Sequence, residues 1–214
     1  WSTGSEDEIL SVEEIQARFD LDHVQKAGAV FDRTRLEWIN GQWIRKLTHD
    51  DLFARLRPFY DRAAADGRIG RPATDDEIAA LLPLIRERIP LLSSAIELTD
   101  FLFLDALQHD PALLVPKRWE AATTLAALEA ARPLIADGIG EGDAPLLDAP
   151  DALEAKLRAL AEEQGWKAGD LFMALRAAAT CLTATPPLFD SMRLLGRAAL
   201  LTRIDQAIAV LRAA

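Results

Sequence analysis

The side chains that most often carry catalysis or hold metals are sparse in this sequence of 214 residues. It contains three histidines, His23, His49 and His109, and a single cysteine, Cys181. None of them has the close His/Cys spacing of a zinc site, so we expect no metal. Cys181 lies in an Ala-rich stretch with no histidine nearby in sequence, which favours an inert buried thiol. One cysteine also excludes an internal disulfide.

The acidic pairs and the glycine-rich stretch also favour structural roles. Asp50-Asp51 and Asp75-Asp76 occur where helices should begin, and the helix dipole favours negative charge there. The alternating glycines of residues 138–142 have acidic neighbours, which would repel a phosphate group. We therefore predict no catalytic residue in this chain.

The elements that must position any functional side chain are helices. Capping-box patterns begin at Ser11 and Thr74, and no segment alternates as a strand would. Apolar spacing predicts an all-α fold of several small helical packets. Asn40-Gly41 predicts a turn or kink. The expected helices cover about 11–19, 36–47, 48–59, 74–89, 91–107, 119–135, 151–163, 168–182, 189–195 and 197–211, with loops at 66–72 and 137–143.

Composition limits the class of partner. The net charge is −10, which argues against a strongly electrostatic nucleic-acid binder, although residues 31–60 hold 6 basic and 4 acidic side chains. No apolar run reaches the roughly 18–20 residues of a membrane span. The start at Trp1 lacks the features of a signal peptide and is typical of a cut from a longer chain. With the single cysteine, this favours the cytoplasm.

Three segments together resemble the bacterial glutamyl-tRNA synthetases, which are class I aminoacyl-tRNA synthetases. The first runs from Trp1 and includes LEWINGQWIR at residues 36–45. The second is LIRER at 84–88, leading to DFLF at 100–103. The third is LRAAAT at 175–180, followed by TPPLF at 185–189 and LLGR at 194–197. The resemblance covers the whole chain in order.

The resemblance implies a division of labour along the chain. Residues 1–47 would end a region that contacts the tRNA stem, residues 48–110 would form a first anticodon-binding helical domain, and residues 111–214 a second. The ATP, Mg and glutamate site of such a ligase lies upstream, in a Rossmann-type domain whose motifs are absent here. This chain would thus carry no catalytic site or cofactor itself. It would bind tRNA(Glu) in the cytoplasm as part of a monomeric glutamate-tRNA ligase.

The resemblance also implies contact residues. The anticodon would be contacted by three arginines, Arg86, Arg88 and Arg176. The turn of Thr185, Pro186 and Leu188 would add further contacts. Arg35, where the family has lysine, and Trp38 would touch the inner side of the tRNA. At Cys181-Leu182 the family often has glycine followed by a serine or arginine, so the chain departs from the pattern there.

Arginine suits this task because its planar guanidinium can donate two parallel hydrogen bonds to the edge of an unstacked base. In the family, arginine at position 88 accompanies a preference for glutamate anticodons over glutamine anticodons. Each arginine also has an ordinary structural interpretation; Arg88, for example, could simply pair with Glu87.

Two other functions remain open at this stage. The acidic balance favours a helical adaptor module that binds protein. A class I lysyl-tRNA synthetase has a similar helical anticodon region, but the LxWxNG run argues against it. A stand-alone enzyme is the least favoured function.

Overall fold

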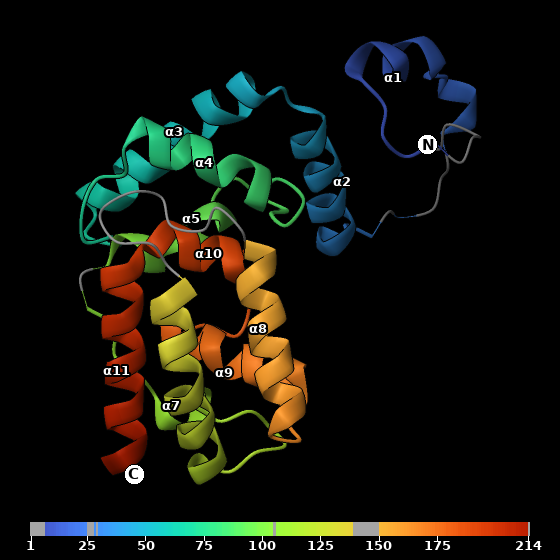
Figure 1. The fold of residues 1–214 in the computed structure, drawn as a ribbon. Coiled ribbons are helices and arrows are strands. Elements are labelled where there is room, and N and C mark those ends of the chain that lie inside the picture. The colour runs from blue at the N-terminus through green and yellow to red at the C-terminus, as the bar shows by residue number, and fades with distance from the viewer. Residues whose placement is uncertain (1–6, 25–27, 29, 105, 139–149, 214) are drawn as a thin grey trace. The chain divides into compact units, whose positions relative to one another are not determined.

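The computed structural model describes residues 7–24, 28, 30–104, 106–138 and 150–213, and this part of the chain contains helices and no strand. The predicted all-α class is therefore confirmed. The chain divides into two compact units, Trp1–Phe59 with Thr74–Ala95, and Tyr60–Ala73 with Ile96–Ala214 (Figure 1). The division into a stem-contact end and two anticodon-binding domains remains a prediction, because it concerns roles rather than contacts.

The first unit begins with short, locally capped elements. They are α1 (Val12–Arg18), η1 (Leu21–His23), α2 (Arg33–Lys46), the first part of α3 (His49–Ala65) and α4 (Asp75–Ile85). The capping box at α1 forms, with the Glu14 N–H donating to Ser11 Oγ at 3.1 Å and the Ser11 N–H donating to Glu14 Oε2 at 2.7 Å. The box of Thr74 and Glu77 forms in the same way at α4. Both predicted helix starts are confirmed.

The expected turn at Asn40-Gly41 is wrong, because both residues lie inside the continuous helix α2. The Asn40 side chain donates through Nδ2 to the main-chain oxygen of Pro90 at 2.6 Å. Gly41 is buried, and a Cβ there would lie 3.5 Å from the Cα of Pro90. Asn40 and Gly41 thus remain helical next to the segment of Pro90, although both residues locally favour a turn.

Helix α4 ends at Ile85 instead of continuing to about residue 89. The main chain tightens into a turn over residues 86–88, where the N–H groups of Arg88 and Ile89 both donate to Ile85 O, at 2.8 and 3.1 Å. Pro90 disfavours helical geometry at the preceding residue, so the helix must end early.

The helix expected over 91–107 is shorter as well. Only α5 (Ser94–Thr99) and the 3-10 turn η2 (Asp100–Phe103) form. The main-chain oxygens of Phe101 and Leu104 accept hydrogen bonds from Arg203 in α11, so these acceptors are occupied by a side chain and not by a continuing helix.

The second unit contains a bundle built from five longer helices and a short one. They are α6 (Pro111–Leu114), α7 (Ala121–Gly138), α8 (Pro150–Glu163), α9 (Ala168–Thr180), α10 (Leu188–Leu195) and α11 (Arg197–Ala213). Helix α11 packs along α7 and α9, and α7 also contacts α8 (Figure 1). Their shared core includes Leu128, Leu157, Leu175 and Ile204, all fully buried. Burial of such a side chain contributes about 1.5–3 kcal/mol.

Of the two expected loops, the first agrees with the structure and the described part of the second does not. Residues 66–72 form a non-helical loop in which Gly67 has a φ of 69°. Of the loop expected at 137–143, Asp137 and Gly138 instead complete α7, and the rest lies outside the described residues. Among the helices that the structure describes, none is long and apolar enough to cross a bilayer.

Candidate nucleic-acid interface

Arg88 lies in the turn that follows α4, and its side chain is exposed. Its backbone N–H is used in the turn, donating to Ile85 O at 2.8 Å. Within the part of the chain that the structure describes, the guanidinium of Arg88 has neither an ion pair nor a hydrogen bond. None of its five N–H donors is therefore used by another described residue.

The neighbouring carboxylate is committed elsewhere. Glu87 pairs with Arg45 of α2, whose Nε donates to Glu87 Oε2 at 2.9 Å. The Nη2 of Arg45 also donates to the main-chain oxygen of Glu87 at 2.9 Å. The alternative in which Arg88 simply pairs with Glu87 is therefore not the arrangement found.

Arg86 differs from Arg88. It caps the end of α4 and is half-buried, and its Nε is buried without a hydrogen-bond acceptor among the described atoms. A buried donor without a partner typically costs about 1–3 kcal/mol. Arg86 thus presents less open hydrogen-bonding capacity than Arg88.

The second group of predicted contact residues forms a stiff corner before α10. Arg176 is half-buried, and its Nε donates to Thr185 Oγ1 at 3.1 Å. The Thr185 hydroxyl in turn donates to Pro186 O at 2.7 Å, and the Ser191 hydroxyl donates to the same oxygen at 3.3 Å. The structure therefore brings Arg176, Thr185 and Pro186 together.

Thr185 and Pro186 are buried, and Leu188 does not lie on the surface of that corner either. Its side chain is 5% exposed and belongs to the core shared by α7, α8, α9 and α11. The Leu188 side chain is therefore not presented to a base at the surface, because the amphipathic helix α10 turns this position inward. The residue supports the corner from inside.

The departure from the family at Cys181 leaves the backbone in a conformation that glycine favours. Cys181 ends α9 with φ 55° and ψ 24°, and its N–H donates to Ala177 O at 2.9 Å. The next N–H, of Leu182, donates to Thr180 Oγ1 at 3.1 Å. Burial raises the pKa of the Cys181 thiol, which agrees with the expectation of an inert cysteine.

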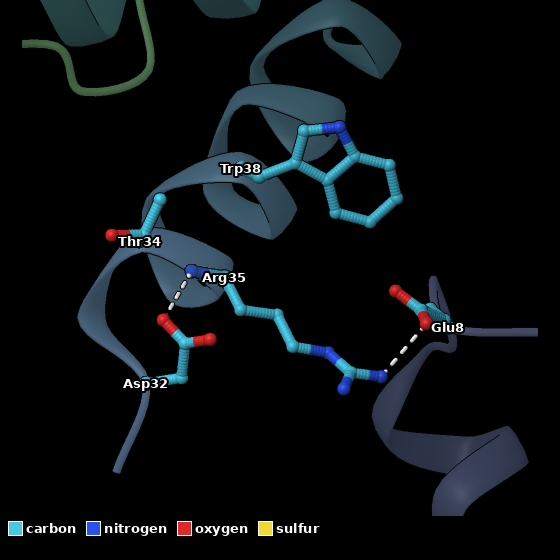
Figure 2. A pocket seen from close by; sticks show the side chains of 5 residues that line it. All are labelled: Glu8, Asp32, Thr34, Arg35 and Trp38. Carbon is cyan, nitrogen blue, oxygen red and sulfur yellow. Dashed lines mark hydrogen bonds and ion pairs between the residues drawn. The ribbon is translucent and has the colours of Figure 1, made fainter.

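The predicted stem contacts lie on α2 (Figure 2). Arg35 extends from the helix to Glu8, with Nη2 2.7 Å from Glu8 Oε1, and its backbone N–H donates to Asp32 Oδ1 at 3.0 Å. Trp38, one turn further on, is 48% exposed. These residues and Thr34 line an open pocket. Exposed ion pairs contribute about 0–1 kcal/mol, so a phosphate could displace Glu8 from Arg35.

Sequence reasoning missed three residues that contact the segment around Arg88, and one buried arginine of the second unit. Asn40 and Gly41 were interpreted as a turn, and Arg45 was noted only as part of a motif. The signal that could have found them is that an Asn-Gly pair interrupts an otherwise regular apolar helix pattern. Arg203 was missed too, although it falls on the buried face of α11 between Leu200 and Ala207.

Metal ligation is not supported by the described side chains, which contain no group of three His, Cys, Asp or Glu able to hold an ion. His109 is half-buried and its Nε2 lies 2.7 Å from Ala178 O, a contact within the bundle.

Comparison with known proteins gives a consistent picture. Residues 51–208 match the family described as "Anticodon binding domain". The chain is 46% identical over 219 residues to a glutamate–tRNA ligase of Roseiflexus castenholzii, covering all of this chain and 41% of that protein. It is 36% identical to the glutamate–tRNA ligase of Herpetosiphon aurantiacus, covering 42% of it. This chain thus spans about two fifths of the length of these relatives.

The solved structures show the same fold. The crystal structure of a glutamate tRNA ligase from Elizabethkingia meningosepticum in complex with its amino acid superposes on 99% of this chain and 39% of its own, with a TM-score of 0.73 and 24% identity. A glutamate-tRNA synthetase from Elizabethkingia anophelis gives a TM-score of 0.68 at 22% identity.

Proposed function

The chain belongs to the family of anticodon binding domains, and from this premise we propose that it binds tRNA(Glu) and reads its anticodon as part of a glutamate–tRNA ligase. In that ligase, ATP and Mg act at a catalytic domain that this chain does not contain. The protein works as a monomer in the cytoplasm. The observation that carries the proposal is the exposed guanidinium of Arg88, which has no partner among the described residues and lies beside a carboxylate that is already engaged.

Arg88 reads the third anticodon base by its hydrogen-bonding pattern. The Watson–Crick edge of cytosine presents two adjacent acceptors, N3 and O2, beside its amino donor, whereas that of guanine presents one acceptor, O6, beside donors at N1–H and its amino group. A guanidinium has donors only, so two parallel hydrogen bonds to this edge are available with cytosine and not with guanine. Glutamate and glutamine anticodons such as CUC and CUG differ at this base, so Arg88 favours the glutamate anticodon.

The other predicted contacts have supporting parts. Arg176 contacts the RNA beside the corner of Thr185 and Pro186, which are themselves buried and fix the path of the chain there, while Leu188 holds that corner from the core. Arg86 makes a secondary contact in the same turn as Arg88. Arg35 and Trp38 meet the inner side of the tRNA, with Arg35 exchanging Glu8 for a phosphate.

The test is binding of tRNA(Glu) transcripts with CUC and CUG anticodons to the wild-type chain and to Arg88→Gln, by filter binding at low and high salt. Loss of one bidentate contact costs about 1–3 kcal/mol, so CUC binding should weaken by roughly 5- to 150-fold. The preference for CUC over CUG should approach one. Arg212→Gln, which removes an exposed charge paired with Glu129, should leave the preference unchanged. Equal affinity of the wild type for both anticodons would refute the proposal.

A further inference from the structure

We infer that Asn40, Gly41 and Arg45 on one face of α2 are positioning residues that hold the turn of Arg88 in its reading geometry. We call these three residues the brace. The inference rests on the proposed function, because it concerns how Arg88 meets a base. All of its contacts lie within the first compact unit.

Arg45 fixes the residue immediately before Arg88 at two points. One hydrogen bond reaches the carboxylate of Glu87 and the other its main-chain oxygen, both at 2.9 Å. Glu87 lies in the turn beyond the end of α4, where the helix no longer supplies a donor to its carbonyl, and the Arg45 guanidinium supplies one. Holding a main-chain atom restrains the direction of the next residue in a way that a side-chain ion pair alone would not.

Asn40 fixes the chain on the other side of Arg88. Its Nδ2 donates to Pro90 O at 2.6 Å, and Pro90 has a restricted backbone φ. Arg88 thus lies between two anchored residues, Glu87 and Pro90. Its own side chain remains exposed, so the restraint acts on the backbone and leaves the guanidinium available.

Gly41 leaves room for the Arg45 guanidinium to lie between α2 and the turn. A Cβ at this position would lie 3.3 Å from Arg45 Nη1, 3.5 Å from Pro90 Cα and 3.7 Å from Ile89 O. Glycine within a helix costs about 1 kcal/mol relative to alanine. The close approach to the Arg45 guanidinium is the compensating feature, because an added methyl group would make ordinary contact with Pro90 and Ile89 but would require Arg45 Nη1 to shift by a few tenths of an ångström.

Arg35 and Trp38 lie on the same helix as the brace. A helix advances about 1.5 Å per residue and bends little, so α2 carries the stem contacts and the support of the anticodon-reading turn as one rigid element. Docking of α2 on the tRNA would therefore set the position of Arg88.

The first test is amide hydrogen exchange of the chain without RNA. Arg45→Met removes both hydrogen bonds while keeping an apolar stem. We expect the amides of Arg88 and Ile89 to exchange at least several-fold faster than in the wild type. Lys46→Met removes the same charge at the next position and should leave them unchanged. Unchanged exchange in Arg45→Met would overturn the inference whatever the chain binds.

The second test is the ratio of CUC to CUG affinity. Arg45→Met and Gly41→Ala should each lower this ratio several-fold, although helix propensity alone predicts that Gly41→Ala stabilises α2. Adding Arg45→Met to Arg88→Gln should lower the ratio no further, because the brace acts only through Arg88. Lys46→Met should weaken both RNAs equally or neither.

The two failures are distinguishable. If Arg88→Gln does not change the ratio, the proposed function fails and this inference fails with it. If Arg88→Gln removes the preference while Arg45→Met and Gly41→Ala retain it in full, only the brace is refuted.

Discussion

Arg203 is a buried cation of the second unit. Its replacement by methionine tests whether its guanidinium stabilises the fold by donating to main-chain oxygens that no helix or sheet satisfies. It is 5% exposed. Its Nη1 donates to Ala179 O at 3.0 Å, and its Nη2 donates to Phe101 O at 2.8 Å and to Leu104 O at 3.0 Å. Burial lowers the pKa of this guanidinium, because the charged form loses its contact with water. The three carbonyl hydrogen bonds offset that loss.

The expected cost follows from those three acceptors. Methionine keeps the apolar stem of the side chain, so little packing is lost. Each carbonyl left without a donor costs about 1–3 kcal/mol, and release of the buried charge returns part of that amount. We therefore expect the free energy of unfolding to fall by about 3–5 kcal/mol. For a chain of this size that corresponds to roughly 10 °C in Tm.

The assay is urea and thermal unfolding followed by circular dichroism at 222 nm. The matched control is Arg212→Met on the same helix, which removes an exposed ion pair with Glu129 and should cost less than about 1 kcal/mol. The reasoning is refuted if Arg203→Met is no more destabilising than Arg212→Met. In that case water must satisfy the three carbonyls as well as the guanidinium does.

Three further predictions concern stability. Cys181→Gly should raise the free energy of unfolding by about 0.5–1 kcal/mol in urea titrations, because the φ of 55° suits glycine, while Cys181→Ala should not. Burial raises the pKa of Tyr60 to about 12, so its neutral form stabilises the fold fully below pH 10, and this contribution of up to about 2–3 kcal/mol is lost as pH rises to 12. Alkaline urea titrations of Tyr60→Phe should show a smaller loss over that interval, although the 2.8 Å hydrogen bond to Thr99 is gone at every pH. Arg132→Met should cost less than about 1 kcal/mol by thermal melting despite its two hydrogen bonds to Asp205, because both side chains are more than a third exposed; a larger loss would show an unexpectedly strong surface pair.

Local signals in the sequence were enough for the class of fold and for several helix starts. The capping boxes at Ser11 and Thr74 depend on residues three positions apart, so they can be recognised without knowing the fold. The helix expected to continue to residue 107 could not be ended correctly in the same way. Its final carbonyls, at Phe101 and Leu104, accept from Arg203 about one hundred residues later, and no local pattern records that contact.

The candidate site divides along the same line. The exposure of Arg88 could be predicted from its place between a helix end and Pro90. That Arg88 has no partner among the described residues could not be predicted, because Glu87 pairs with Arg45, which is 42 residues away in the sequence. Arg176 was expected to contact RNA, with a structural ion pair as the alternative, and the structure shows that its Nε donates to the Thr185 hydroxyl. Pairings between distant elements decide which of several arginines remains open, and sequence spacing does not report them.

Asn40-Gly41 and Cys181 each adopt a backbone conformation that their residue types do not favour, the first pair helical and the cysteine left-handed. In α2 a pair with a strong turn preference adopts helical geometry, because each residue contacts the segment of Ile89 and Pro90. At Cys181 a left-handed conformation persists although glycine is absent, because its N–H still bonds to Ala177 O and the neighbouring hydroxyl of Thr180 still caps the chain. In both places surrounding contacts outweigh a preference of about 1 kcal/mol. Such exceptions therefore indicate where a backbone path is required by its neighbours, and both adjoin segments proposed to contact the anticodon.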